Sequence, residues 1–145
     1  MLSAEEAWEI SQLRALLECQ ALGWAIPNMV LADFRKCARI LDDLDSSDSV
    51  DAKILLNAQF HASLYEPARR ERTLEMVEKL RMNFERYLRY TWEETHHLER
   101  SQAEHRQILR LCELRDVERA CETLRMHVLG TGDLLTECLR LKGNG

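Results

Sequence analysis

Apolar residues recur at intervals of three or four positions along almost the whole chain, and alternation at every second position never persists. The first spacing is that of one face of an α-helix, whereas sustained alternation would indicate a β-strand. Only 5 glycines and 2 prolines interrupt the 145 residues, and Leu, Ala, Glu and Arg outnumber the β-branched Val and Ile. That balance favours helices. The sequence therefore predicts an all-α domain, an antiparallel bundle of about six helices.

Capping and helix-breaking residues give the expected helix boundaries. Ser3 and Glu6 form a capping box that opens the first helix, and Asn28 is expected to cap the second. Gly130 and Gly132 fall inside the last helix and are candidates for a bend or an early end. The other expected boundaries are Gly23 with Pro27, Leu44, the loop 45–49, Pro67, helices from about 69 to 92 and from about 98 to 114, and a cap at Asp116.

The composition narrows the classes of function. The formal net charge is −5, whereas a protein that binds nucleic acid by itself usually presents a basic face. No stretch approaches the roughly 20 apolar residues of a membrane span. The acidic start of the chain lacks the basic segment of a signal peptide, so a cytoplasmic protein without membrane contact is expected. The five cysteines form no CxxC pair, and we interpret them as reduced core residues.

Three of the five histidines lie among apolar residues at helical spacing. His61 follows Asn57 by four residues, so both side chains project from one apolar face of the third predicted helix. His105 and His127 lie on apolar faces of two further helices. The three imidazoles are therefore expected to point into the interior of the bundle.

Buried imidazoles need partners, because an unpaired polar group in the interior costs ~1–3 kcal/mol. None of the three histidines has an acidic partner on its own helix face, so one shared divalent cation fits the pattern. Imidazole suits zinc, nickel, copper or iron, and the side-chain oxygen of Asn57 is a candidate fourth ligand. The pattern leaves open the alternative of three core histidines satisfied by ordinary hydrogen bonds.

Five short motifs carry a resemblance to a known family. They are LRALLE at 13–18, NAQFH at 57–61 with a leucine at 64, EHRQIL at 104–109, Asp116 followed by Ala120, and MH at 126–127. Their order and spacing resemble the FadR C-terminal domain (FCD) family, the effector-binding domains of GntR-type transcription regulators. The likeness spans nearly the whole chain. It implies the effector-binding and dimerisation domain of a bacterial regulator, one that senses a small organic acid.

The resemblance also implies a metal site. In metal-binding members one divalent ion lies at the centre of the bundle, and zinc or nickel is expected here. The matching positions of this chain are Asn57, His61, His105 and His127. Many members have Asp where this chain has Asn57. Because an amide oxygen is a weaker ligand than a carboxylate, a lower metal affinity is expected.

The partners implied by the resemblance are a small-molecule carboxylate effector and a second copy of the chain. The effector would bind beside the ion, with Arg14 of the first helix as a contact and Trp92 as a further candidate. Contact with DNA is expected only through an N-terminal winged-helix domain, which the present sequence, taken as the single domain 1–145, lacks.

Two other functions remain as alternatives. A metal-dependent enzyme with a three-histidine site would need an acid or base beside the ion, and none is identified on the histidine faces, so no enzymatic activity is expected. A purely structural dimerisation module would use the histidines only for packing.

Overall fold

The computed structural model describes residues 2–143, except for the side chains of Arg86 and Glu94, and this part of the chain contains helices but no β-strand. The predicted all-α fold is therefore confirmed. The helices are α1 (Ala4–Ala25), α2 (Leu31–Ser46), α3 (Val50–Tyr65), α4 (Glu71–Thr95), α5 (His97–Glu113) and α6 (Val117–Gly143), with short 3₁₀ turns η1 (Ile26–Asn28) and η2 (Glu66–Ala68).

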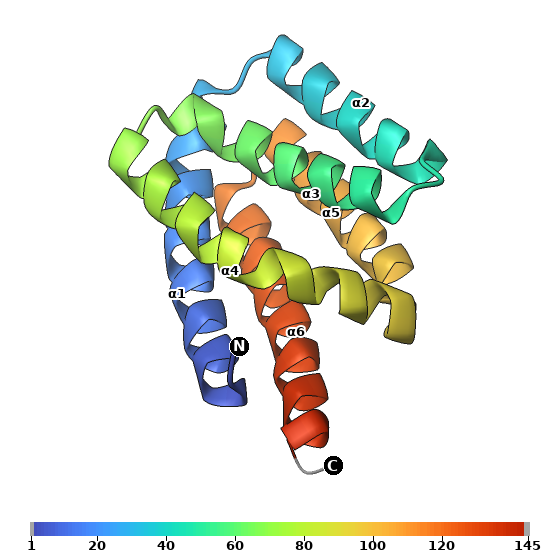
Figure 1. Ribbon diagram of the computed structural model, residues 1–145. Coiled ribbons are helices and arrows are strands. Elements are labelled where there is room, and N and C mark those ends of the chain that lie inside the picture. Colours follow the sequence, from blue (N-terminus) through green and yellow to red (C-terminus); the bar gives the residue numbers. More distant parts are fainter. Residues whose placement is uncertain (1, 144–145) are drawn as a thin grey trace.

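Helices α1 and α6 lie side by side and run in opposite directions, so that the start of α1 and the end of α6 lie at the same end of the bundle (Figure 1). Helices α2 and α3 form a hairpin at the other end of the molecule, α5 packs against α2 and α6, and α4 crosses α1 and α6. Buried side chains from all six helices fill the shared core, including Leu22, Leu41, Phe60, Val77, Ile108 and Leu124. None of the helices within 2–143 has an apolar stretch of the length and hydropathy that a bilayer span requires.

Local hydrogen bonds explain most of the helix starts. The Ser3 hydroxyl accepts the Glu6 backbone N–H at 3.1 Å, as the capping box predicts. The Ser49 hydroxyl accepts the Ala52 N–H at the start of α3. The Asp116 carboxylate accepts the backbone N–H of Arg119 at the start of α6. Side-chain oxygens thus satisfy N–H groups that have no partner inside the helix.

The prediction that Asn28 caps α2 is wrong. Val30 occupies the cap position, and its backbone N–H donates to the Asp33 carboxylate at 2.8 Å. The side-chain amide of Asn28 instead donates to the carbonyl oxygen of Pro67 at 3.0 Å, which joins η1 to η2. The Asn28 side chain, which the local sequence assigned to the start of α2, therefore makes a tertiary contact instead.

The glycines of α6 neither end the helix nor interrupt it, since α6 continues through Gly130 and Gly132 to Gly143. Gly132 faces α1, where a Cβ added to it would lie 1.9 Å from Ser11 Oγ and 2.5 Å from Ser11 Cβ. The absence of a side chain at 132 thus permits the close approach of α1 and α6. Gly23 likewise lies inside α1 rather than after it.

Candidate metal centre and effector pocket

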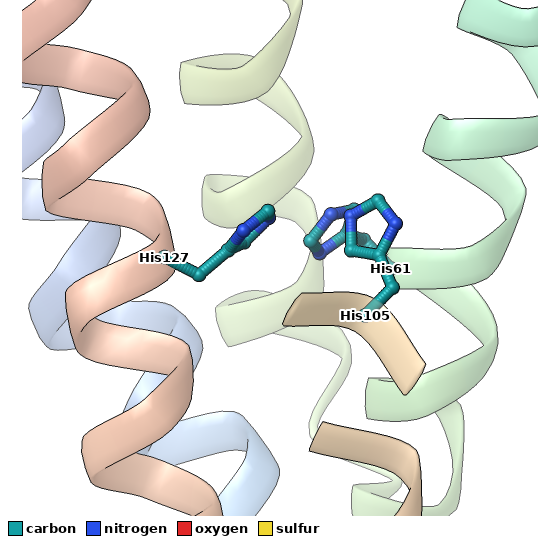
Figure 2. Close-up of side chains that lie close together, drawn as sticks. All are labelled: His61, His105 and His127. Carbon is teal, nitrogen blue, oxygen red and sulfur yellow. The ribbon is translucent and has the colours of Figure 1, made fainter. Parts of the chain in front are cut away.

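His61 of α3, His105 of α5 and His127 of α6 converge in the interior of the bundle (Figure 2). One ring nitrogen from each lies within 4.8 Å of the other two. The ring centroids are 4.7 to 5.5 Å apart, and all three side chains are buried. The structure thus brings together side chains from three different helices, as expected from their apolar faces. His96 and His97 lie outside the cluster; the His97 ring contacts the Thr131 hydroxyl at 3.2 Å.

The ring of His105 is oriented by Gln102. The Gln102 side-chain NH₂ donates to the Leu41 carbonyl at 3.2 Å and to the Asp45 carboxylate at 2.8 Å. Both partners are acceptors, so the amide oxygen Oε1 must face His105 Nδ1, 2.9 Å away. An oxygen acceptor at that position requires that Nδ1 carries the proton. The His105 lone pair is therefore on Nε2.

The ring of His127 is oriented by Glu104 of α5. The Glu104 Oε1 atom lies 2.9 Å from His127 Nδ1. This hydrogen bond lowers the pKa of Glu104, so the carboxylate is ionised at neutral pH and acts only as an acceptor. His127 Nδ1 therefore donates, and its lone pair is also on Nε2.

The ring of His61 is oriented through Tyr65 by Glu18 of α1. The Tyr65 hydroxyl donates to Glu18 Oε1 at 2.6 Å, and burial followed by the charge of Glu18 raises the pKa of Tyr65 well above 10, so the phenol keeps its proton. The same hydroxyl oxygen lies 3.3 Å from His61 Nδ1 and is left to accept from it. Glu18 is held in turn by Arg14, whose Nε donates to Oε2 at 2.8 Å.

In the neutral form of each ring, these three contacts place the proton on Nδ1 and leave Nε2 as the nitrogen that can bind a cation. His105 Nε2 is buried and has no hydrogen-bond partner in the part of the chain that the structure describes. Burial, together with the positive charge of Arg81, lowers the pKa of His61 and His105 well below 6.5. Neutral imidazoles that donate from Nδ1 and offer Nε2 are the form in which histidine binds a metal ion. The donor set therefore fits a single cation.

Sequence analysis missed the acidic partners of the histidines. Glu104 and Glu18 come from helices other than those of His127 and His61, and the residue pattern of a single helix face does not reveal such partners. Glu104 stands directly before His105 in the sequence, so it lies on a different face of α5 and reaches a different histidine.

A pocket beside the cluster is lined by residues of five helices, α1, α3, α4, α5 and α6. Its lining includes His61, His127, Asn57, Arg14 and Trp92. The remaining lining residues are Ile54, Ala58, Glu78, Arg81, Met82, Phe84, Glu85, Leu88, Ser101, Val128 and Thr131.

Three buried side chains of this pocket, Arg14, Arg81 and Trp92, can only donate hydrogen bonds. Arg14 is buried, and because its Nε is paired with Glu18, its two terminal nitrogens are the atoms left to meet a ligand. Trp92 Nε1 is buried without a partner among the residues described. Arg81, for which a surface position is the commoner case, is buried, and its Nε also finds no partner within 2–143. These donors favour an anionic or strongly accepting ligand.

The buried neutral histidines give a prediction for stability in the metal-free protein. The folded-state pKa of His61 and His105 lies below that of the unfolded chain, near 6.5, so the unfolded chain binds protons first as the pH falls. Their contribution is fully present above pH 6.5 and is lost progressively below it. Each histidine can contribute a slope of up to ~1.4 kcal/mol per pH unit.

Urea unfolding with a chelator present, at pH 7.5, 6.5 and 5.5, measures this effect. The free energy of unfolding should change little between the first two values and fall below pH 6.5. His96→Asn, at an exposed histidine, should keep the same profile. A free energy that stays constant from pH 6.5 to 5.5 would mean that the cluster is not buried and neutral.

Comparison with known proteins identifies the family. The FCD domain model matches residues 9–130, and no curated protein matches. A solved structure of a transcriptional regulator of the GntR family from Pseudomonas syringae pv. tomato str. DC3000 is 32% identical, with a TM-score of 0.85 over 96% of this chain and 59% of that one. E. coli McbR/YncC shares the fold, with 21% identity and a TM-score of 0.80 over 92% of this chain and 65% of that one.

The chain thus spans about three-fifths of the length of these two solved structures. The family match covers most of the sequence, including all three clustered histidines and Arg14. The chain belongs to the FCD domain family, the effector-binding domains of GntR-type transcription regulators.

Proposed function

We propose that this chain is the effector-binding and dimerisation domain of a bacterial GntR-family regulator, and that it senses a small organic acid at a divalent metal site. The observation that carries the proposal is the arrangement of the three histidines. Each Nδ1 atom faces a hydrogen-bond acceptor, and one ring nitrogen of each lies within 4.8 Å of the others. Buried nitrogen lone pairs without a hydrogen-bond donor are stabilised by a cation bound among them.

His61, His105 and His127 would hold the ion, with Asn57 on the pocket wall as the fourth ligand. Zinc or nickel suits this neutral nitrogen set. Bound there, the ion supplies a positive centre with open positions for an oxygen ligand. Gln102, Glu104 and Tyr65 would hold the three rings in place, and outer partners of this kind maintain the basicity and orientation of ligating histidines.

Arg14, Arg81 and Trp92 would bind the effector. All three side chains line the pocket and are buried, and two of them carry an unpaired N–H donor among the described contacts. A carboxylate offers enough lone pairs to accept from several of these donors at once. Their desolvated state adds to specificity, because a ligand without acceptors would leave them unpaired. Glu104 is engaged by His127, so no acid–base step is assigned to it.

The proposed macromolecular partners are a second copy of the chain and, through a separate N-terminal domain, DNA. Helix α1 exposes the large apolar side chains of Trp8, Leu13, Leu16 and Trp24, a feature that supports an interface between protein chains. The GntR-family relative has a chain longer than the region shared with this one, which supports a further domain in the full regulator.

Binding of a carboxylate to zinc-loaded protein tests the effector site. A panel of monocarboxylates, dicarboxylates and sugar acids is expected to contain compounds that raise the melting temperature, because a ligand that binds only the folded state stabilises it. For the best of these, Trp92→Phe should weaken binding by about tenfold, since it removes one hydrogen bond to a charged group, worth ~1.5 kcal/mol. Titration calorimetry measures the change.

Trp8→Phe is the matched control, because Trp8 is exposed on α1 and lies outside the pocket. This variant should bind the same carboxylate as tightly as the wild type. Equal affinities of wild type and Trp92→Phe would remove Trp92 from the site, and a panel without any stabilising carboxylate would contradict the proposed effector class.

A further inference from the structure

A chain of four buried side chains connects α1 to the histidine cluster. Arg14 donates to Glu18, the Tyr65 hydroxyl donates to the other oxygen of Glu18, and the same hydroxyl contacts His61 Nδ1. We infer that Tyr65 and Glu18 are positioning residues, which fix the tautomer of His61 and connect the metal centre to the arginine that meets the effector. The role given to these two residues rests on the proposed function, whereas the hydrogen bonds that join them do not depend on it.

The direction of every hydrogen bond in this chain is fixed by chemistry. An ionised carboxylate can only accept, so Glu18 receives both the Arg14 Nε–H and the Tyr65 hydroxyl proton. A hydroxyl has one proton, so Tyr65 can only accept from His61. His61 must therefore donate from Nδ1 and keep its lone pair on Nε2. Without the hydroxyl, no acceptor among the described residues would lie within hydrogen-bond distance of Nδ1 to enforce this tautomer, because the nearest Glu18 oxygen is 3.7 Å away.

The burial of Glu18 couples the two ends of the chain. Its side chain is 0% exposed, and a buried carboxylate is stable only while its charge is compensated. Arg14 supplies that compensation through Nε, and the same side chain lines the pocket. An anion bound to Arg14 and a cation bound to His61 therefore alter the surroundings of one carboxylate. Each should change the affinity of the other by the same factor, since coupling between two binding sites is reciprocal.

The first test is the tautomer of His61 in metal-free protein, read from ¹⁵N chemical shifts of the imidazole. The wild type is expected to show the proton on Nδ1. Tyr65→Phe removes only the hydroxyl, and a large fraction of His61 should then carry the proton on Nε2. Tyr90→Phe, at a half-buried tyrosine of α4 that contacts Lys142, is the matched control and should leave the tautomer unchanged. An unchanged His61 tautomer in Tyr65→Phe overturns the inference.

The second test is the affinity for zinc, measured by competition with a chelator. Tyr65→Phe should weaken zinc binding by ~10–100-fold, the usual effect of removing an outer partner of a ligating histidine. Tyr90→Phe should have the wild-type affinity. Arg14→Lys keeps the charge but not the guanidinium geometry, so it should weaken zinc binding in the wild-type background and have little further effect in Tyr65→Phe.

The outcomes separate this inference from the proposed function. A wild type that binds no zinc contradicts the proposed metal site, while the tautomer measurement still decides the role of Tyr65. Tight zinc binding with equal effects of Arg14→Lys in both backgrounds leaves the metal site intact and overturns the connection through Glu18.

Discussion

Replacing His105 with alanine is expected to weaken zinc binding by at least about 100-fold. Structural zinc sites with four ligands bind with ~10–16 kcal/mol, so the loss of one ligand removes several kcal/mol, and each ~1.4 kcal/mol is tenfold in affinity. His105 is the most informative of the three, because it is 0% exposed and its Nε2 has no partner in the described structure. Competition with a chelator of known affinity measures the change.

His96→Asn is the matched control for this experiment. His96 is an exposed histidine outside the cluster, and its backbone has a φ of 54°, a conformation that asparagine adopts readily. The control should bind zinc like the wild type, and circular dichroism should show that both variants keep the helical fold. If His105→Ala and wild type bound zinc equally, the cluster would not be the metal site.

Gly132→Ala is expected to destabilise the protein by ~1–3 kcal/mol. The new Cβ would lie 2.5 Å from Ser11 Cβ, an atom fixed to the backbone of α1, so the two helices would have to separate. Overpacking of this kind costs ~1–3 kcal/mol, which exceeds the gain of up to ~1 kcal/mol in helix propensity from Gly to Ala. Urea unfolding of the metal-free protein measures the difference.

Gly130→Ala provides a control two residues away in the same helix. A Cβ at this position meets nothing within 4 Å, and the backbone φ is not positive. Only the propensity gain remains, so this variant should be more stable than the wild type by up to ~1 kcal/mol. Equal effects of the two substitutions would contradict the close contact between α1 and α6.

Sequence alone predicts the features of this protein that depend on one helix at a time. Apolar spacing gives the all-α fold, and the capping box at Ser3 gives the start of α1. It also places His61, His105 and His127 on inward faces, which the structure brings to one point. Each of these inferences uses only the geometry of a single helix, which is known before any tertiary structure is.

Features that depend on how helices pack against each other are absent from such patterns. Asn28 contacts Pro67 across the molecule instead of capping α2, and Gly132 serves the contact with Ser11. The acceptors that orient His61 and His127 lie on other elements or further along the chain. Arg81 has the sequence signature of a surface residue on a charged helix, and only the crossing of α4 over the pocket buries it.

X-ray absorption at the zinc edge, on protein loaded with one equivalent of zinc, tests the central claim most directly. Imidazole produces a characteristic outer-shell scattering pattern, and Zn–N bonds are ~2.0–2.1 Å long. The arrangement of the cluster predicts a first shell of nitrogen and oxygen with three imidazoles. A first shell containing sulfur at ~2.3 Å, or one without imidazole scattering, would show that zinc is bound elsewhere in the chain.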